Sequence, residues 1–217
     1  IGPTPVIRKA FRERIGSLPD SYGLFSAYLL LKPGRIPYIN RNLYYFAGKD
    51  VWKTLFDLEA MRPGMVLLSA QAPDGDPAWC DVVTLMTPVA TRPWKAWEGS
   101  APGRRPEAYT ALKAAMTQAT VDFACARLPE LRDAIAHTYA ATYRHYTGAP
   151  HGAAYGLLKD WRSIMASHIP ARTKFDNLLL TGQNLTVHGA IGVTLSAAAT
   201  CSEIVGTEYL AKKIANA

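Results

Sequence analysis

The sequence predicts an α+β fold, a mixed structure in which helices pack on a sheet and a strand–turn–helix unit closes the chain. Three observations predict it. Apolar residues make up 49% of the 217 residues, which is enough to build a packed core. Short apolar runs of strand length alternate with segments of helical periodicity. Two groups of strand candidates precede a last strand, turn and helix. This pattern leaves the order of the strands in the sheet open.

The strand candidates are short runs of aliphatic and aromatic residues that end at proline or glycine. The first run, SYGLFSAYLLLK, is too rich in strand-forming residues for a helix and ends at the turn KPGRIPYIN. The turn PDGDP separates the third and fourth runs. The candidates are residues 21–32, 42–48, 64–72, 79–89 and 177–182.

The helix candidates show apolar residues at helical spacing between recognisable start and stop signals. The clearest is 105–130, with Pro106 in its first turn and a core-facing stripe formed by Tyr109, Leu112, Met116 and Phe123. A helix from Asp50 to Met61 begins at an aspartate N-cap and stops before Pro63. Two more are expected: a short helix over 129–140 and a final helix from about Ala190 to Ile214.

Composition excludes several classes of protein. The three cysteines, Cys80, Cys125 and Cys201, are widely spaced and form no CxxC, so neither zinc nor a disulfide framework is indicated. We therefore expect a reducing, cytoplasmic environment. No run reaches the ~18 apolar residues of a membrane span. No Ser-His-Asp order, HExxH or P-loop appears, which gives hydrolase, zinc and nucleotidase functions no support.

The net charge of +7 has two readings. One is an ordinary solvated surface. The other is an anionic partner: nucleic acid, an anionic membrane surface or an anionic cofactor. The basic residues are scattered and no nucleic-acid motif is present, so we expect no nucleic-acid partner.

Residues 178–206 combine a short apolar run, a polar turn and a helix rich in small residues. Gly182 permits backbone angles or close contacts that a side chain would block. Gly189 and Gly192 bracket the start of the helix, where unpaired N–H groups and a partial positive charge suit an electron-rich oxygen. The pyrimidine carbonyl of a flavin would fit there. The alternative is a helix that packs tightly on a sheet and binds no ligand.

The segment NLLLTGQNLTVHGAIGVTLSAAATCSEIVG, residues 177–206, resembles the C-terminal flavin-binding strand–turn–helix of the phytoene desaturase, carotenoid isomerase and retinol saturase family. Those proteins are FAD-dependent oxidoreductases of amine-oxidase-like architecture. Residues 142–158, 92–116 and 29–52 are similar to further segments of the family, in family order. The resemblance implies a mainly substrate-binding domain over 1–140 and a return to the FAD-binding domain over 141–217.

The chain lacks the GxGxxG motif with which this family begins and which holds the FAD pyrophosphate. We therefore expect a C-terminal half or subunit that needs an N-terminal FAD-binding half in the same or a partner chain. Alone, it should bind FAD weakly and be inactive.

The resemblance also implies roles for single residues. Gly182, Gln183 and Asn184 would face the ribityl and pyrophosphate part of FAD, and turn capping is the alternative role of Gln183 and Asn184. Backbone N–H groups at the pyrimidine edge would come from Gly189, Ile191, Gly192 and Val193.

Two side chains are catalytic candidates. His188 abuts the expected flavin and could donate a proton or a hydrogen bond, and Tyr155 would line the flavin or substrate side with Gly156. A structural histidine and ordinary half-buried packing are the alternatives. Further lining residues in the same region would be Tyr143, His145, Tyr146 and His151.

The expected function is hydride exchange between FAD and a carbon of an apolar polyene or isoprenoid, in a desaturation, saturation or isomerisation. Such an enzyme would be cytoplasmic or associated with a membrane surface. Two alternatives stay open: a non-catalytic binding or partner module that keeps the fold without flavin, and a basic surface protein that binds anionic lipid or nucleic acid.

Overall fold

A computed structural model describes residues 4–56, 58, 62–75, 78–101, 103–142, 152–162 and 164–216. Helices and an antiparallel sheet confirm the predicted α+β class. The chain divides into two compact units: unit 1 comprises Ile1–Ser21 and Tyr155–Ala217, and unit 2 comprises Tyr22–Ala154. The assignment of substrate binding to 1–140 and FAD binding to 141–217 stays a prediction.

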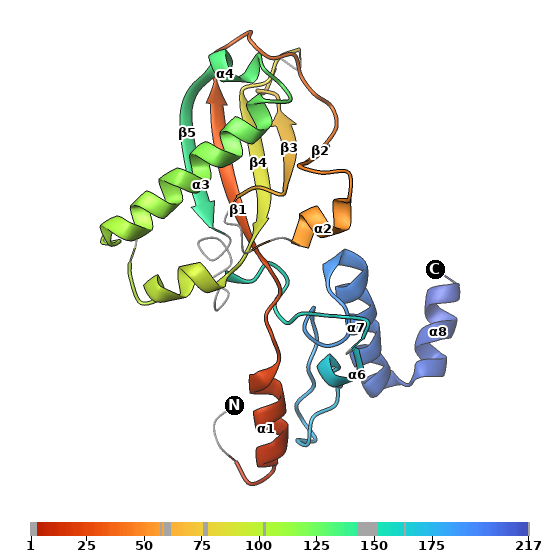
Figure 1. Cartoon of the computed structure of the whole chain (residues 1–217). Helices are drawn as coiled ribbons and strands as arrows, with labels where there is room; N and C mark the ends of the chain where they lie inside the picture. Colours follow the sequence, from red (N-terminus) through yellow and green to blue (C-terminus); the bar gives the residue numbers. More distant parts are fainter. Residues whose placement is uncertain are drawn as a thin grey trace. The chain divides into compact units, whose positions relative to one another are not determined.

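Unit 2 is built on a five-stranded sheet with the order β2-β3-β4-β1-β5, in which every neighbouring pair is antiparallel (Figure 1). The four strands predicted before residue 90 are all present. The strands are β1 (Gly23–Leu31), β2 (Leu43–Phe46), β3 (Met65–Gln71), β4 (Val82–Val89) and β5 (Ile135–Thr142).

The core of unit 2 lies between the sheet and helix α3 (Glu107–Cys125), which crosses one face of the sheet (Figure 1). Alternate residues of β1 point into this core, and Phe25, Ala27 and Leu29 are fully buried. Met116 of the predicted apolar stripe is buried in α3 as well. This alternation fixes the register of β1, because a slip by one residue would expose the whole apolar row.

The predicted helix at Asp50 is confirmed at its start as α2 (Val51–Phe56). The Asp50 carboxylate accepts a hydrogen bond from the backbone N–H of Lys53 at 3.0 Å, as an N-cap should. A single 3-10 turn, η1 (Arg92–Trp97), precedes α3 and packs Trp94 edge-on against Tyr109.

The helix predicted over 129–140 is wrong for most of its length. Only Leu131–Ala134 forms a helix, α4, and β5 begins at Ile135. The alanines of this segment favour a helix locally, but residues 135–142 gain hydrogen bonds along β1 instead. Tertiary pairing thus overrides local propensity.

Unit 1 contains α1 (Lys9–Ser17), α6 (Ile164–Ser167), α7 (Gly189–Val205) and α8 (Thr207–Ala215). The final helix was predicted as continuous, but Gly206, with φ at 86°, separates α7 from α8. The strand predicted over 177–182 is also absent. Leu179 makes one isolated bridge with Arg172, and the Leu180 N–H donates to the carbonyl of Ala171 at 2.8 Å.

Each unit pairs its own ends by backbone hydrogen bonds. In unit 2, the Ala154 N–H donates to the Tyr22 carbonyl at 2.8 Å. In unit 1, the Ser21 N–H donates to the Gly156 carbonyl at 2.7 Å. Unit 2 is therefore an insertion whose two ends meet, placed between two segments of unit 1.

Candidate functional site

The two side chains predicted to be catalytic lie against each other in unit 1. The rings of Tyr155 and His188 stack with their centroids 4.7 Å apart and their planes at 24°. His188 is the residue directly before α7, and the Tyr155 N–H donates to the Ser21 hydroxyl at 3.1 Å. A histidine and a phenol thus share one place at the start of the helix.

The environment of His188 favours its neutral form. Burial lowers the pKa of the imidazole below its ordinary value, and the positive charge of Lys159 lowers this pKa further. A neutral imidazole carries one donor nitrogen and one acceptor nitrogen. Near neutral pH, His188 can therefore accept a proton or donate a hydrogen bond.

Lys159 is a functional neighbour that sequence reasoning missed. Its ammonium donates to the carbonyl oxygens of Ser167 at 2.6 Å, Asn184 at 2.8 Å and Leu185 at 3.3 Å. Burial lowers the pKa of this lysine. These hydrogen bonds hold the predicted Gln183–Asn184 turn in place. Sequence motifs cannot reveal such an interaction, because its acceptors are backbone carbonyls.

Asn184 forms a hydrogen bond with a segment that is distant in sequence. Its side-chain oxygen accepts a hydrogen bond from the Leu157 N–H at 2.9 Å. Gly156, with φ at +71°, leaves room for this carboxamide, because a Cβ there would overlap the Asn184 side chain. The structure thus brings Asn184 together with the Tyr155–Gly156 segment.

The start of α7 is open on one side and closely packed on the other. Ile191 is 79% exposed and Val193 is 38% exposed, whereas Gly192 is buried. A Cβ on Gly192 would overlap the carbonyl oxygen of Val187, so the turn before the helix folds back onto its first turn. His188 makes no side-chain capping bond to the first turn of α7.

The turn at Gly182 offers open backbone. Gly182 has φ at +112° and Gly189 has φ at +81°, and no atom lies within 4 Å of a Cβ placed on either. A pair of hydroxyls holds the intervening segment on the helix: Thr186 and the fully buried Ser196 lie 3.2 Å apart. The two glycines and the first turn of α7 therefore present accessible polar backbone on a fixed support.

The remaining predicted lining residues, Tyr143, His145, Tyr146 and His151, lie outside the described residues. Among the residues that the structure does describe, no three His, Cys, Asp or Glu side chains gather to hold a metal ion. Within the same part of the chain, no helix is both long and apolar enough to cross a bilayer.

Unit 2 presents a second candidate surface, on the sheet face away from α3. In the antiparallel register Tyr28 lies opposite Tyr139, and Tyr44 lies opposite Leu67. The rings at the two edges are open to solvent, with Tyr44 at 57% exposed and Tyr139 at 62%. The two pairs lie in different cross-strand rows of the same sheet face, and their phenols and aliphatic groups can bind an apolar molecule that carries few polar atoms.

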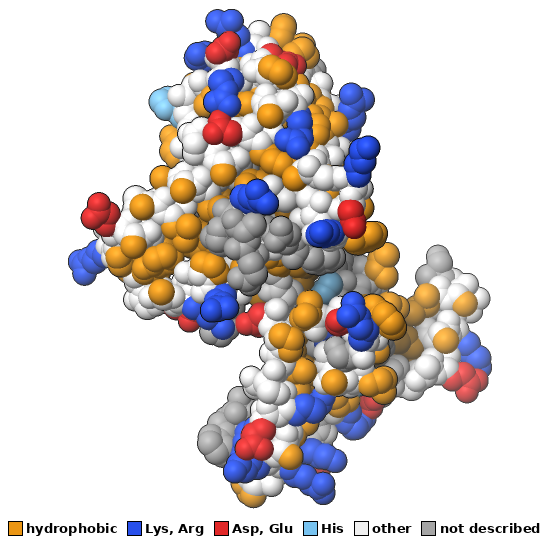
Figure 2. All heavy atoms as spheres, in the orientation of Figure 1, with side chains coloured by type: hydrophobic (Ala, Val, Ile, Leu, Met, Phe, Trp, Pro, Cys, Tyr) orange, Lys and Arg blue, Asp and Glu red, His pale blue; other side chains and the backbone are white. Residues whose placement is uncertain are grey.

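Charge is distributed rather than concentrated on the visible surface. Figure 2 shows lysine and arginine side chains over this face of both units, with acidic side chains among them. Such interspersion does not make, on this face, the continuous basic track that a nucleic-acid backbone requires.

Comparison with known proteins gives similarity to one kind of enzyme, and no family model matches the chain. The chain is similar to all-trans-retinol 13,14-reductase of Homo sapiens, with 25% identity over 215 residues that cover 89% of this chain and 35% of that protein. The enzyme of the same name from Macaca fascicularis gives the same identity and coverage. That from Rattus norvegicus is 29% identical over 143 residues, which cover 60% of this chain and 23% of that protein. The chain thus spans about a third of the length of the first two relatives.

Proposed function

We propose that this chain is part of an FAD-dependent oxidoreductase that acts on carbon–carbon bonds of an apolar, retinoid-like polyene. The observation that carries the proposal is the similarity to all-trans-retinol 13,14-reductase, which runs through 89% of the chain. The similarity therefore includes the sheet of unit 2 as well as the candidate site of unit 1. The name of these relatives favours reduction of a double bond among the three reactions expected of the family.

The residues at the start of α7 fit an isoalloxazine edge. Their N–H groups are uncapped by side chains, Gly189 and Gly182 leave open space, and the helix dipole favours a developing negative charge. Residues 189 and 191–193 would hold the pyrimidine edge, and residues 182–184 would hold the ribityl and pyrophosphate part. When bound, the flavin supplies hydride transfer.

The protein's own side chains would orient the substrate and supply a proton to it. His188 is held flat against Tyr155 and favours its neutral form, so it can donate a hydrogen bond, or take up a proton from solvent and pass that proton to a substrate carbon. Lys159 acts through the carbonyls that it binds, because it fixes the turn on which the site depends. The open sheet face of unit 2, with Tyr44 and Tyr139, would bind the apolar body of the substrate.

The proposed enzyme also needs a partner surface. Helix α7 exposes Ile191, Leu195 and Ile204 at 79%, 56% and 71%. Exposed apolar residues at this density on one helix are typical of an interface. We propose that an N-terminal FAD-binding half, in the same or a partner chain, covers part of α7, and that the assembly meets a membrane surface peripherally to collect its substrate.

The test compares the chain alone with the intact product of its gene, both incubated with FAD and freed of unbound cofactor. Flavin absorption in the visible should appear in the intact protein and stay weak in the chain alone. Ile191→Trp adds bulk at the start of α7 and should lower the bound flavin about tenfold, since a misplaced ring costs at least one good contact. Ile214→Trp, at an exposed position of α8, is the matched control and should leave the spectrum unchanged.

Activity is read as loss of polyene absorbance when all-trans-retinol is added to the reduced protein. An intact protein that stays colourless with FAD would remove the oxidoreductase proposal, and a binding module without flavin would replace it. A coloured protein that leaves all-trans-retinol and related polyenes unchanged would keep the flavin and reject the substrate class.

A further inference from the structure

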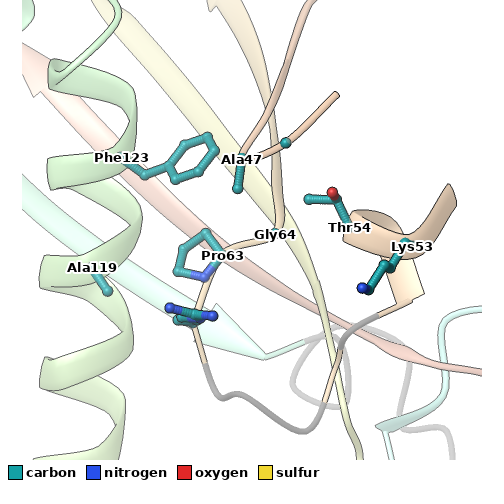
Figure 3. Close-up of a pocket in the computed structure, with 9 residues that line it drawn as sticks. Ala47, Lys53, Thr54, Pro63, Gly64, Ala119 and Phe123 are labelled. Carbon is teal, nitrogen blue, oxygen red and sulfur yellow. The ribbon is translucent and has the colours of Figure 1, made fainter. Parts of the chain in front are cut away.

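Unit 2 contains a cavity that the proposed flavin chemistry does not use. Its volume is about 560 Å³, within the range of about 300–1,000 Å³ typical of small-molecule sites. The walls come from α3 on one side and from residues 47–48, 53–54 and 62–64 on the other. Figure 3 shows Phe123 and Ala119 of α3 facing Pro63 and Ala47, with Thr54 and Lys53 of α2 across the space.

One part of the wall is positively charged. Lys53 and Arg62 both line the cavity, and no acidic side chain lines it among the residues that the structure describes. Neither cation makes a side-chain hydrogen bond or an ion pair with another described residue. Neighbouring Arg127 differs, because its guanidinium donates to the carbonyls of Phe123 and Phe46 at 2.9 and 3.1 Å. Two cations thus face one space while a third nearby is satisfied by the backbone.

The rest of the wall is largely apolar. The Phe123 ring, the Pro63 ring and the methyl groups of Ala47 and Ala119 carry no hydrogen-bonding side-chain atoms. Thr54 adds little polarity, since its hydroxyl already donates to the Asp50 carbonyl at 2.6 Å. This mixed lining favours a ligand that combines an anionic group with a hydrocarbon part.

Close backbone packing builds this wall into the fold. A Cβ on Gly64 would overlap the carbonyl oxygen of Thr54, and a Cβ on Gly48 would lie 3.1 Å from the Thr54 hydroxyl. The Ala47 N–H donates to the Gly64 carbonyl at 2.9 Å, which continues the β2–β3 pairing to the edge of the cavity. The two glycines let α2 approach the strand ends, so the cavity is a product of the local fold.

We infer that this cavity binds an amphipathic anion, a carboxylate or phosphate on a hydrocarbon chain, with its head group between Lys53 and Arg62. Arginine binds both head groups through paired N–H donors, and lysine adds a second point charge. The hydrocarbon lies along Phe123, Pro63 and Ala119. The shared chemistry fits a fatty acid and a monoalkyl phosphate alike, and their relative affinity distinguishes these two sources.

Calorimetric titration of the whole chain tests the inference with four probes kept below their micelle concentrations: dodecanoate, dodecyl phosphate, dodecanol and inorganic phosphate. At least one of the two amphipathic anions should bind. Dodecanol and inorganic phosphate should bind at least about tenfold more weakly, because dodecanol lacks the anionic group and inorganic phosphate lacks the hydrocarbon chain. The double variant Lys53→Gln/Arg62→Gln should lower the affinity for that anion about tenfold or more. The matched control Arg35→Gln/Arg41→Gln removes the same charge from exposed positions of unit 2 and should change nothing.

A second variant tests the hydrocarbon end. Ala119→Leu fills the apolar part of the cavity and should lower the affinity for the amphipathic anion without changing the affinity for inorganic phosphate. Far-UV circular dichroism checks that the variant keeps its fold. Equal loss in both double variants would overturn the inference, because binding would then follow net charge. Binding of dodecanol or of inorganic phosphate as tight as that of the amphipathic anions would overturn it as well, and so would absence of binding by both anions.

Discussion

The substitution Gly192→Ala should destabilise unit 1, although alanine is the better helix former. In an unobstructed helix interior, replacing glycine by alanine stabilises by about 1 kcal/mol. At residue 192 the added Cβ overlaps the Val187 carbonyl oxygen and lies 2.5 Å from its carbonyl carbon and 3.0 Å from its Cγ2. Because the obstacle is backbone, relief requires the turn to move away from α7. Overpacking costs about 1–3 kcal/mol, and an overlap with backbone belongs at the upper end of that range. After subtraction of the gain of about 1 kcal/mol, we expect a net loss of roughly 1–2 kcal/mol.

Gly16→Ala is the matched control in the same unit. Gly16 lies in α1, its φ is ordinary and no atom lies within 4 Å of its Cβ position. This variant should be neutral or more stable by about 0.5 kcal/mol. Urea unfolding followed by far-UV circular dichroism gives both values, and hydrogen exchange of the α7 amides assigns the loss to the helix start. A Gly192→Ala protein as stable as the wild type would refute the close packing of the turn.

Three further predictions concern the same unit. Gly156→Ala should cost about 2 kcal/mol, because φ is +71° and the Cβ overlaps Asn184, and it should cost less in an Asn184→Ala background; urea midpoints in a double-mutant cycle measure this, and strictly additive losses would contradict it. His188 binds fewer protons in the folded chain than in the unfolded one, so the free energy of unfolding should fall as pH drops below about 6.5. His188→Gln should flatten this dependence between about pH 7.5 and about pH 5.5; a slope equal to that of the wild type would disprove the assignment. Lys159→Met should cost about 1.5–3 kcal/mol and raise the pKa of His188 in an NMR titration, and an unchanged or lower pKa would speak against their coupling.

Most of the sheet could be predicted because its signals are local. Residues 21–32 and 79–89 carry strand-forming residues between proline and glycine stops, and they became β1 and β4. The helix expected over 129–140 failed because the partner that draws its second half into β5 is β1, more than 100 residues earlier. The local pattern of one sequence does not indicate that long-range pairing.

The break at Gly206 shows a different limit. Glycine inside a helical pattern is compatible with a continuous helix and with a stop, and only the backbone angle of 86° decides between them.

The contacts around the predicted site residues could not be inferred from the sequence. The glycines at 182, 189 and 192 stood out by spacing, yet Gly192 serves to admit the Val187 carbonyl, which no spacing indicates. Lys159 was invisible because its partners are main-chain oxygens that every residue possesses. The stacking of Tyr155 on His188 joins residues that a sequence places 33 positions apart.

The meeting of Tyr22 and Ala154 sets an order of assembly for the chain. Unit 2 can close as soon as Ala154 has been synthesised, whereas α1 must wait for its partner, since Arg14 donates to the carbonyl of Ala166 at 2.6 Å. Once unit 2 has folded, its paired ends shorten the loop between the two halves of unit 1 from roughly 130 residues to a few, which lowers the entropy lost on closure. The inserted domain therefore acts as a folding template: a destabilised sheet would delay the α1–α6 contact even though no residue of that contact had changed.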